Sequence, residues 1–253
     1  MSTEVILGKE QIDNYLKEVA KQYRKLSGKS MPAEITLIGG ASILVNYGFR
    51  DSTYDIDALI HAASSMKDAI NYVTDTMKLP NDWLNDDFKN TTSYTPKLVN
   101  YSVYYRTFSN VVTIRTITGE YLVAMKLKAF RKYKHDISDI VGIMREHERM
   151  GKPLTFEQID TAVKNLYDGW EHMPENAYAL IESILSESDM DELYKTYVQE
   201  ESAAKDVLIS FDEKYPKVVQ NGNLDAILSQ LLQRQDKERT DSSTYYVSLS
   251  RTE

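Results

Sequence analysis

The fold is decided by residues 35–60, which read ITLIGGASILVNYGFRDSTYDIDALI. Three of the first four residues of this stretch are apolar and predict a short strand, and Gly39-Gly40 predicts a turn into a helical segment over residues 41–47. Residues 54–60 then alternate polar and apolar side chains, as a half-buried strand does. This stretch therefore predicts a strand, a glycine turn, a helix and a second strand.

Helices are predicted on both sides of this stretch. Apolar residues recur at three- and four-residue spacing over residues 9–27, which indicates an amphipathic helix. Ser65 and Asp68 have the spacing of a capping box, which would open a helix that runs to about Lys78. The following Asn-, Asp- and Thr-rich segment, residues 80–96, predicts a loop with one short helix.

The rest of the chain divides into a small sheet and a long helical region. Two β-rich runs, residues 101–108 and 111–117, complete the predicted sheet. The pattern is then helical at about 120–133, 136–149, 156–169, 175–187, 190–214 and 223–238. We therefore expect an α/β (α+β) fold with a mixed-sheet domain at residues 1–150, a helical C-terminal region at 151–238 and a flexible tail at 239–253.

Composition limits the kinds of site that the chain can hold. The 253 residues include no cysteine and only four scattered histidines, so disulfides, thiol nucleophiles and cysteine zinc sites are excluded. A metal would have to bind carboxylates. Residues 1–135 contain 18 Lys and Arg against 14 Asp and Glu, whereas residues 136–253 contain 12 against 24. The first half can attract an anion such as a nucleotide. The second half would repel a long nucleic acid and suits either a solvated helical shell or a docking surface for a basic partner.

No part of the sequence predicts a membrane segment. The longest apolar runs fall far short of the roughly 18 residues that a membrane-spanning helix needs. The polar start MSTEVILGKEQ does not resemble a signal peptide. We therefore expect a cytoplasmic protein.

Two features of the central stretch point to chemistry. Asp55 and Asp57 are two residues apart on a predicted strand, so their side chains would leave the same face about 7 Å apart along the strand and could share magnesium ions. Gly39-Gly40 lets a backbone approach a ligand closely, and the following helix would present free N–H groups and the hydroxyl of Ser42 to a triphosphate. Each feature alone also fits an exposed strand end or an ordinary turn, but together they are more specific.

The combination resembles a known family. The pattern Ile38-Gly39-Gly40-Ala41-Ser42, followed after twelve residues by Asp55-Ile56-Asp57, is similar to the signature of polymerase-beta-type nucleotidyltransferases. A second block, YLVAMKLKAFR at residues 121–131 followed by DISDI at 136–140, resembles the AbiEii-like branch, which includes toxins of bacterial toxin–antitoxin systems. The resemblance covers about residues 30–145. It implies that the glycine turn holds nucleotide phosphates and that Asp55 and Asp57 bind two Mg²⁺ ions.

Lys126 is a candidate functional residue on grounds that do not depend on the family resemblance. On a helical wheel over residues 122–134 it lies inside the apolar arc, whereas Lys128, Arg131 and Lys132 lie on the polar side. A lysine at the centre of a buried face usually has an anionic partner, because stranding its charge would cost several kcal/mol. That partner is either a carboxylate of the scaffold or a phosphate, and both interpretations stay open.

The remaining candidates are ambiguous from the sequence. Arg50 and Thr53 precede the acidic pair and could orient a nucleotide, although an ordinary polar loop explains them equally well. Asp136 and Asp139 suit a helix start through capping and the helix dipole. Many members of the wider superfamily carry a third acid on a later strand, where residues 111–117 have none. Either Asp136 completes the site as a catalytic residue, or the chain binds without catalysing.

The sequence therefore predicts a magnesium-dependent nucleotidyltransferase. Its substrate would be a nucleoside triphosphate, and the acceptor would be an RNA such as tRNA, a protein or a small molecule. The resemblance adds a toxin with an antitoxin protein as partner. The alternative is a catalytically inactive module that binds a nucleotide or a partner.

Overall fold

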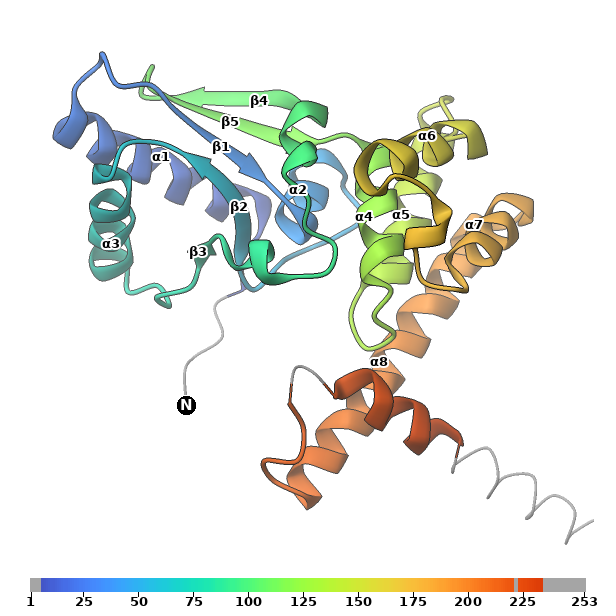
Figure 1. The fold of residues 1–253 in the computed structure, drawn as a ribbon. Coiled ribbons are helices and arrows are strands. Elements are labelled where there is room, and N and C mark those ends of the chain that lie inside the picture. The colour runs from blue at the N-terminus through green and yellow to red at the C-terminus, as the bar shows by residue number, and fades with distance from the viewer. Residues whose placement is uncertain (1–5, 221–222, 234–253) are drawn as a thin grey trace, which may run out of the picture. The chain divides into compact units, whose positions relative to one another are not determined.

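The computed structural model describes residues 6–220 and 223–233 (Figure 1). The chain forms two compact units, one of Met1–Phe130 with Asp139–Asp191 and the other of Arg131–Ser138 with Glu192–Glu253. The tail predicted at 239–253 lies outside the described residues, and the domain boundary predicted at residue 150 stays a prediction. No helix in the described part of the chain is long and apolar enough to cross a membrane.

The first unit is built on a five-stranded mixed sheet, which confirms the predicted fold class. Its strands are β1 (Ala33–Leu37), β2 (Ile56–His61), β3 (Leu84–Asn85), β4 (Ser102–Phe108) and β5 (Val112–Ile117). They lie in the order β3-β2-β1-β5-β4. The central strand β1 pairs antiparallel with β2 and parallel with β5, and β4 and β5 pair antiparallel. The short strand β3, which the sequence did not predict, pairs parallel with β2.

One face of this sheet is covered by two helices, and the other carries most of the polar strand residues. The helices are α1 (Lys9–Ser27) and α3 (Ser65–Met77), which pack on the side of the alternate strand residues Ala33, Ile35 and Leu37 (Figure 1). The residues between them, Glu34 and Thr36, belong to the opposite face because successive strand side chains alternate. Asp57 shares that opposite face, since its neighbours Ile56 and Ala58 are part of the core against α1 and α3.

The remaining elements follow the sequence prediction closely. They are α2 (Gly39–Asn46), η1 (Asp87–Asn90), η2 (Pro96–Tyr101), α4 (Gly119–Ala129), α5 (Asp136–Arg149), α6 (Phe156–Tyr167), η3 (Trp170–His172), α7 (Ala177–Ser186) and α8 (Met190–Lys214). Thr155 and Gln158 form a complete capping box at the start of α6. A helical run also covers residues 224–233, and the rest of the helix predicted to residue 238 lies outside the described residues.

Two local predictions are wrong. Ser65 does not cap α3, because the helix is preceded by Ser64, which makes no side-chain cap bond, and the Ser65 hydroxyl instead shares a hydrogen bond with Ser27. The helix predicted at 120–133 ends at Ala129, since Phe130 adopts the left-handed conformation with φ 48°. Arg131 and the basic residues after it therefore do not continue the polar side of α4.

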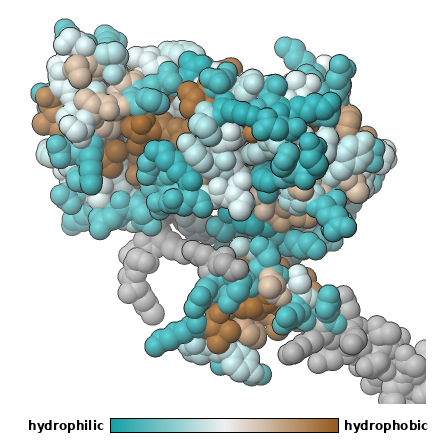
Figure 2. Space-filling view, in the orientation of Figure 1, coloured by the Kyte–Doolittle hydropathy of each residue, from teal (hydrophilic) through white to brown (hydrophobic). Residues whose placement is uncertain are grey.

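The second unit has a small apolar core of its own. Ala204 and Leu208 of α8 are buried together with Leu228 from the helical run 224–233. Partly buried apolar residues surround them, and Figure 2 shows brown surface over these helices. This unit contains none of the glycine turn, the acidic pair or Lys126.

Candidate active site

The glycine turn lies at the end of the central strand. Gly39 is the first residue of α2 and has φ +52°, a conformation that favours glycine. A Cβ at Gly40 would lie 3.0 Å from Oγ1 of Thr53 and 3.3 Å from Cζ of Arg50. A Cβ at Gly39 would lie 3.9 Å from Oδ2 of Asp57. Two of the predicted nucleotide-binding residues and one predicted metal ligand therefore meet the glycine backbone.

The start of α2 suits an anion. Among the described residues, no side chain caps this helix, and its first intrahelical bond is donated by the N–H of Ser42 to the carbonyl of Ile38 at 3.3 Å. The preceding N–H groups point out of the helix end, where the helix dipole is positive. Backbone donors and a positive dipole end are the features that bind phosphates at helix N-termini.

The two acids occupy different positions from those predicted. Asp55 lies in a bend before β2 and is exposed, so only Asp57 stands on the strand, where it is half-buried. The carbonyl of Asp57 accepts a hydrogen bond of 2.9 Å from the N–H of Ile38, which fixes this acid beside the turn. Both side chains offer hard carboxylate oxygens, the donors that Mg²⁺ prefers.

No third acid stands on β5. The residues that β5 presents to the polar face are Thr113 and Arg115, and Arg115 donates to the hydroxyl of Ser102 at 2.7 Å. No group of three or more His, Asp or Glu that could hold a metal ion occurs in the described ranges 6–220 and 223–233. Two carboxylates with substrate phosphates and waters are nevertheless a common Mg²⁺ environment.

Lys126 is buried and has an anionic partner, as its position on the helical wheel predicted. Its residue is 9% exposed, and its Nζ lies 2.8 Å from Oδ2 of Asp139. The Nη1 of Arg50 donates to the same oxygen, also at 2.8 Å. The two cationic nitrogens are therefore no more than 5.6 Å apart, because each lies 2.8 Å from one atom. Asp139 thus joins α4 and α5 to the loop that contacts Gly40.

The other acid of this helix has a different role in the structure. Asp136 belongs to the second unit and is fully buried. Its carboxylate accepts from the guanidinium of Arg131 at 2.8 and 3.1 Å and from the backbone N–H of Arg131 at 3.1 Å. The structure therefore brings Asp139 to Lys126. The sequence does not separate the two acids, because each is followed by an apolar residue, Ile137 or Ile140.

Ser42 is engaged inside the protein. It is 0% exposed, and its hydroxyl accepts a 3.0 Å hydrogen bond from the N–H of Ile117 at the end of β5. This bond ties α2 to the central sheet. The structure thus gives the Ser42 side chain a scaffold contact and leaves the backbone of the turn as the part of this motif that can meet a phosphate.

Close packing positions the helices behind the site. Tyr47 shares a 2.9 Å hydrogen bond with Nε2 of His147, and a Cβ at Gly119 would fall within 2.6 Å of both side chains. Burial, with a smaller contribution from the charge of Glu120, raises the pKa of Tyr47 well above its ordinary value. Phe49 packs against Gly142, where a Cβ would come within 2.4 Å of the ring. These contacts fix α4 and α5, and so Lys126 and Asp139.

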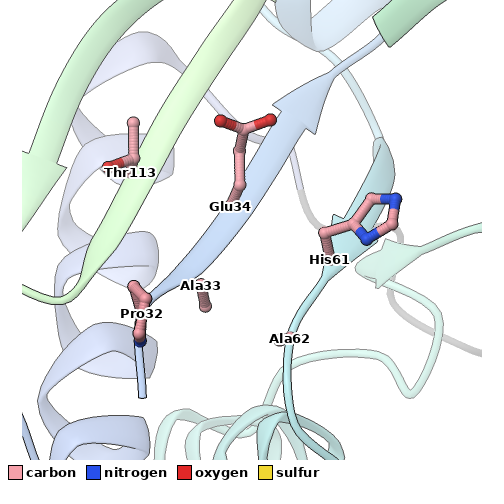
Figure 3. Close-up of a pocket in the computed structure, with 6 residues that line it drawn as sticks. All are labelled: Pro32, Ala33, Glu34, His61, Ala62 and Thr113. Carbon is pink, nitrogen blue, oxygen red and sulfur yellow. The ribbon is translucent and has the colours of Figure 1, made fainter. Parts of the chain in front are cut away.

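A hollow of about 470 Å³ lies elsewhere on the same sheet. It is lined by Pro32, Ala33, Glu34, His61, Ala62 and Thr113, and Figure 3 shows the side chains of Glu34, His61 and Thr113 around it. These residues stand at the start of β1 and β5 and at the end of β2. The glycine turn follows the other end of β1, about 16 Å away along the strand. The hollow is therefore separate from the candidate active site.

Comparison with known proteins agrees with this geometry. Residues 14–168 match the family described as "Nucleotidyltransferase of unknown function (DUF6036)". The matched range contains the glycine turn, the acidic pair, Lys126 and Asp139. Neither the curated proteins nor the solved structures gave a match. The match covers more than half of the chain, and the protein belongs to this nucleotidyltransferase family.

Proposed function

We propose that the protein is a magnesium-dependent nucleotidyltransferase that moves a nucleoside monophosphate from a nucleoside triphosphate to an acceptor. The observation that carries the proposal is the arrangement around Gly40. A backbone without a side chain, the hydroxyl of Thr53 and the guanidinium of Arg50 meet there at the start of α2. Guanidinium groups and helix N-termini are the usual partners of phosphates in proteins.

Asp55 and Asp57 would hold the metal. They lie at the start of β2, and the carboxylate of Asp57 faces Gly39. Two Mg²⁺ ions, when bound there, would neutralise charge on the triphosphate. The ions would use the two carboxylates together with phosphate oxygens, which fits a site with two acids rather than three.

The remaining residues would position the triphosphate and stabilise the charge that builds up on it. In the proposed reaction an acceptor hydroxyl oxygen bonds to the α-phosphorus, its proton passes to water, and the bond from the α-phosphorus to the β-phosphate oxygen breaks. Pyrophosphate leaves with that electron pair. Asp139 holds Arg50 and Lys126 together. These two cations would bind the β- and γ-phosphates and stabilise the negative charge that builds up on the leaving pyrophosphate.

The finer assignment rests on the sequence resemblance. The block around Lys126 supports a place in the AbiEii-like branch, and we propose a toxin whose acceptor is tRNA or another essential molecule and whose partner is an antitoxin protein. Such a reaction uses cytoplasmic nucleoside triphosphates. A small-molecule acceptor is the other candidate, because the chain's excess of acids disfavours a long nucleic acid.

A second function is favoured by two observations. The polar face of β5 carries Thr113 and Arg115 where a third acid would stand, and Asp136 is bound by Arg131. A protein that binds a nucleoside triphosphate without transferring it would have these features.

One experiment separates the two functions. Each nucleoside triphosphate is titrated calorimetrically with and without Mg²⁺, and transfer is followed with α-³²P-labelled nucleotides in a bacterial extract. We expect Mg²⁺-dependent binding and labelling of an acceptor, both lost in Asp57→Asn and both kept in Asp51→Asn, an exposed acid of the same loop. Binding without labelling supports the inactive module. Undiminished metal-dependent binding in the Asp55→Asn, Asp57→Asn double variant contradicts the site.

A further inference from the structure

Three aromatic side chains form a cluster at the surface of α6, η3 and α7. The rings of Phe156 and Trp170 are almost parallel, with centroids 6.0 Å apart and an interplanar angle of 7°. Tyr178 stands edge-on to both, at 5.4 Å from Phe156 and 5.0 Å from Trp170. Tyr178 is 41% exposed, and the other two rings are partly exposed. We call these three residues the aromatic cluster; none of them contacts the candidate active site in the described structure.

The aromatic cluster lies in a strongly acidic part of the chain. Residues 156–191 contain nine Asp and Glu and a single Lys, a net charge of −8 that equals the net charge of the whole protein. Figure 2 shows a mainly hydrophilic surface over α6. The exposed acids next to the cluster in sequence or by contact are Glu157, Glu171 and Glu182.

Two rings of the aromatic cluster lie next to carboxylates. The indole Nε1 of Trp170 donates to Oδ1 of Asp160 at 2.9 Å, while Lys164 donates to the other oxygen at 2.6 Å. Both donors lower the pKa of Asp160, with Lys164 the larger cause, so this carboxylate stays ionised beside the ring. The charge of Glu182 raises the pKa of Tyr178, which places that carboxylate close to the phenol.

Rings surrounded by carboxylates match one kind of partner. A guanidinium or ammonium group is attracted both to the face of Trp or Tyr and to the acids around it, and a guanidinium can also stack on the ring. A nucleic acid or an anionic membrane would be repelled by the same charge. We propose that the aromatic cluster and its acidic rim form a docking surface for an arginine-rich segment of another protein.

The fluorescence of Trp170 can report binding at this surface. The chain has two tryptophans, and Trp83 is only 1% exposed. In a Trp83→Phe protein, all tryptophan emission would therefore come from Trp170. The probe is a short synthetic peptide of arginine, glycine and serine, and its control carries citrulline at every arginine, which keeps the shape and removes the charge. We expect the arginine peptide to change Trp170 emission and to bind less tightly as salt is raised, and the citrulline peptide to do neither.

Matched variants separate a specific surface from general attraction to an acidic protein. With a dye-labelled arginine peptide, we expect Tyr178→Ala to weaken binding about tenfold although no charge changes, and Tyr178→Phe, which keeps the ring, to restore most of it. Removing three charges as Glu157→Gln, Glu171→Gln and Glu182→Gln should weaken binding more than removing three as Glu10→Gln, Asp75→Asn and Asp82→Asn. Melting curves confirm that each variant is folded.

Three results would overturn the proposal. The first is arginine-peptide binding that leaves Trp170 emission unchanged. The second is an equal loss of affinity in the two charge-removed triple variants, which would mean general electrostatic attraction. The third is no binding of the arginine peptide at low salt. None of these results bears on nucleotide transfer, because the surface shares no residue with the candidate active site.

Discussion

Lys126 on α4 binds Oδ2 of Asp139 on α5 at 2.8 Å, and this pair connects the helices of the first unit to the glycine turn. The connection is made by Arg50, which donates to the same oxygen and lies against Gly40. A buried carboxylate that holds two cations beside the glycine turn would keep both cations in place before the proposed nucleotide binds. Such preorganisation is what favours charge stabilisation in a transferase.

Replacing Lys126 with methionine tests whether this cation acts on the substrate. Lys126→Met keeps the apolar stem, and Asp139 still has Arg50, so the stability loss should be smaller than the roughly 3–5 kcal/mol expected when a buried charge loses its only partner. Nucleotide transfer should fall on the order of a hundredfold. Urea unfolding and transfer are measured on the same preparation. Lys128→Met, on the same helix, is the control.

Two outcomes would show that Lys126 has a purely structural role. One is transfer that matches the unchanged protein. The other is a large loss of stability with a proportionate loss of activity, as removal of a purely structural ion pair would give.

The glycine turn can be tested by adding one methyl group. In Gly40→Ala the new Cβ would meet Thr53 and Arg50 at 3.0 and 3.3 Å, so either side chain must move and the phosphate site should be distorted. We expect nucleoside triphosphate affinity to fall about tenfold or more while the protein stays folded. Gly48→Ala is the matched control, because a Cβ there has nothing within 4 Å. Equal affinity in the two variants would contradict the assignment of this turn.

The toxin assignment predicts an effect on growth. Expression of the unchanged protein in bacteria should slow growth, because nucleotide transfer onto tRNA or another essential acceptor would reduce translation. Asp57→Asn should be harmless at the same protein level, and Asp51→Asn should remain toxic. Growth curves with immunoblots check this. Toxicity from Asp57→Asn equal to that of the unchanged protein would mean that another activity causes it.

Stability should fall at alkaline pH. Burial, followed by the charge of Asp13, raises the pKa of Tyr105 to about 12, and burial raises that of Tyr167 as well. An unfolded tyrosine loses its proton near pH 10, so the folded state binds more protons above that pH. The contribution of these tyrosines is therefore complete below about pH 10 and is lost as pH rises through their folded values.

Denaturant unfolding between pH 9 and 11 measures this effect. Tyr105→Phe should show a shallower decline than the unchanged protein, and Tyr72→Phe, at an exposed tyrosine, provides the comparison. A decline that is identical in Tyr105→Phe and the unchanged protein would contradict the predicted contribution of Tyr105.

The sequence by itself determined the elements that local patterns specify. The order of strand, glycine turn, helix and strand and the amphipathic helix α1 follow from periodicity and from the conformational preferences of single residues. The burial of Lys126 was predictable for the same reason, because its position on the apolar side of α4 depends only on the helical repeat.

Tertiary structure alone decided which distant residues meet. Asp136 and Asp139 are equally good helix-start acids, and only the folded chain shows that Asp139 contacts Lys126 and that Asp136 is bound by Arg131. The hydroxyl of Ser42 looked available for a phosphate until its contact with Ile117, 75 residues away, showed it to be part of the scaffold. Local propensity acts over a few residues, whereas these contacts depend on packing between segments far apart in the chain, which a sequence pattern does not record.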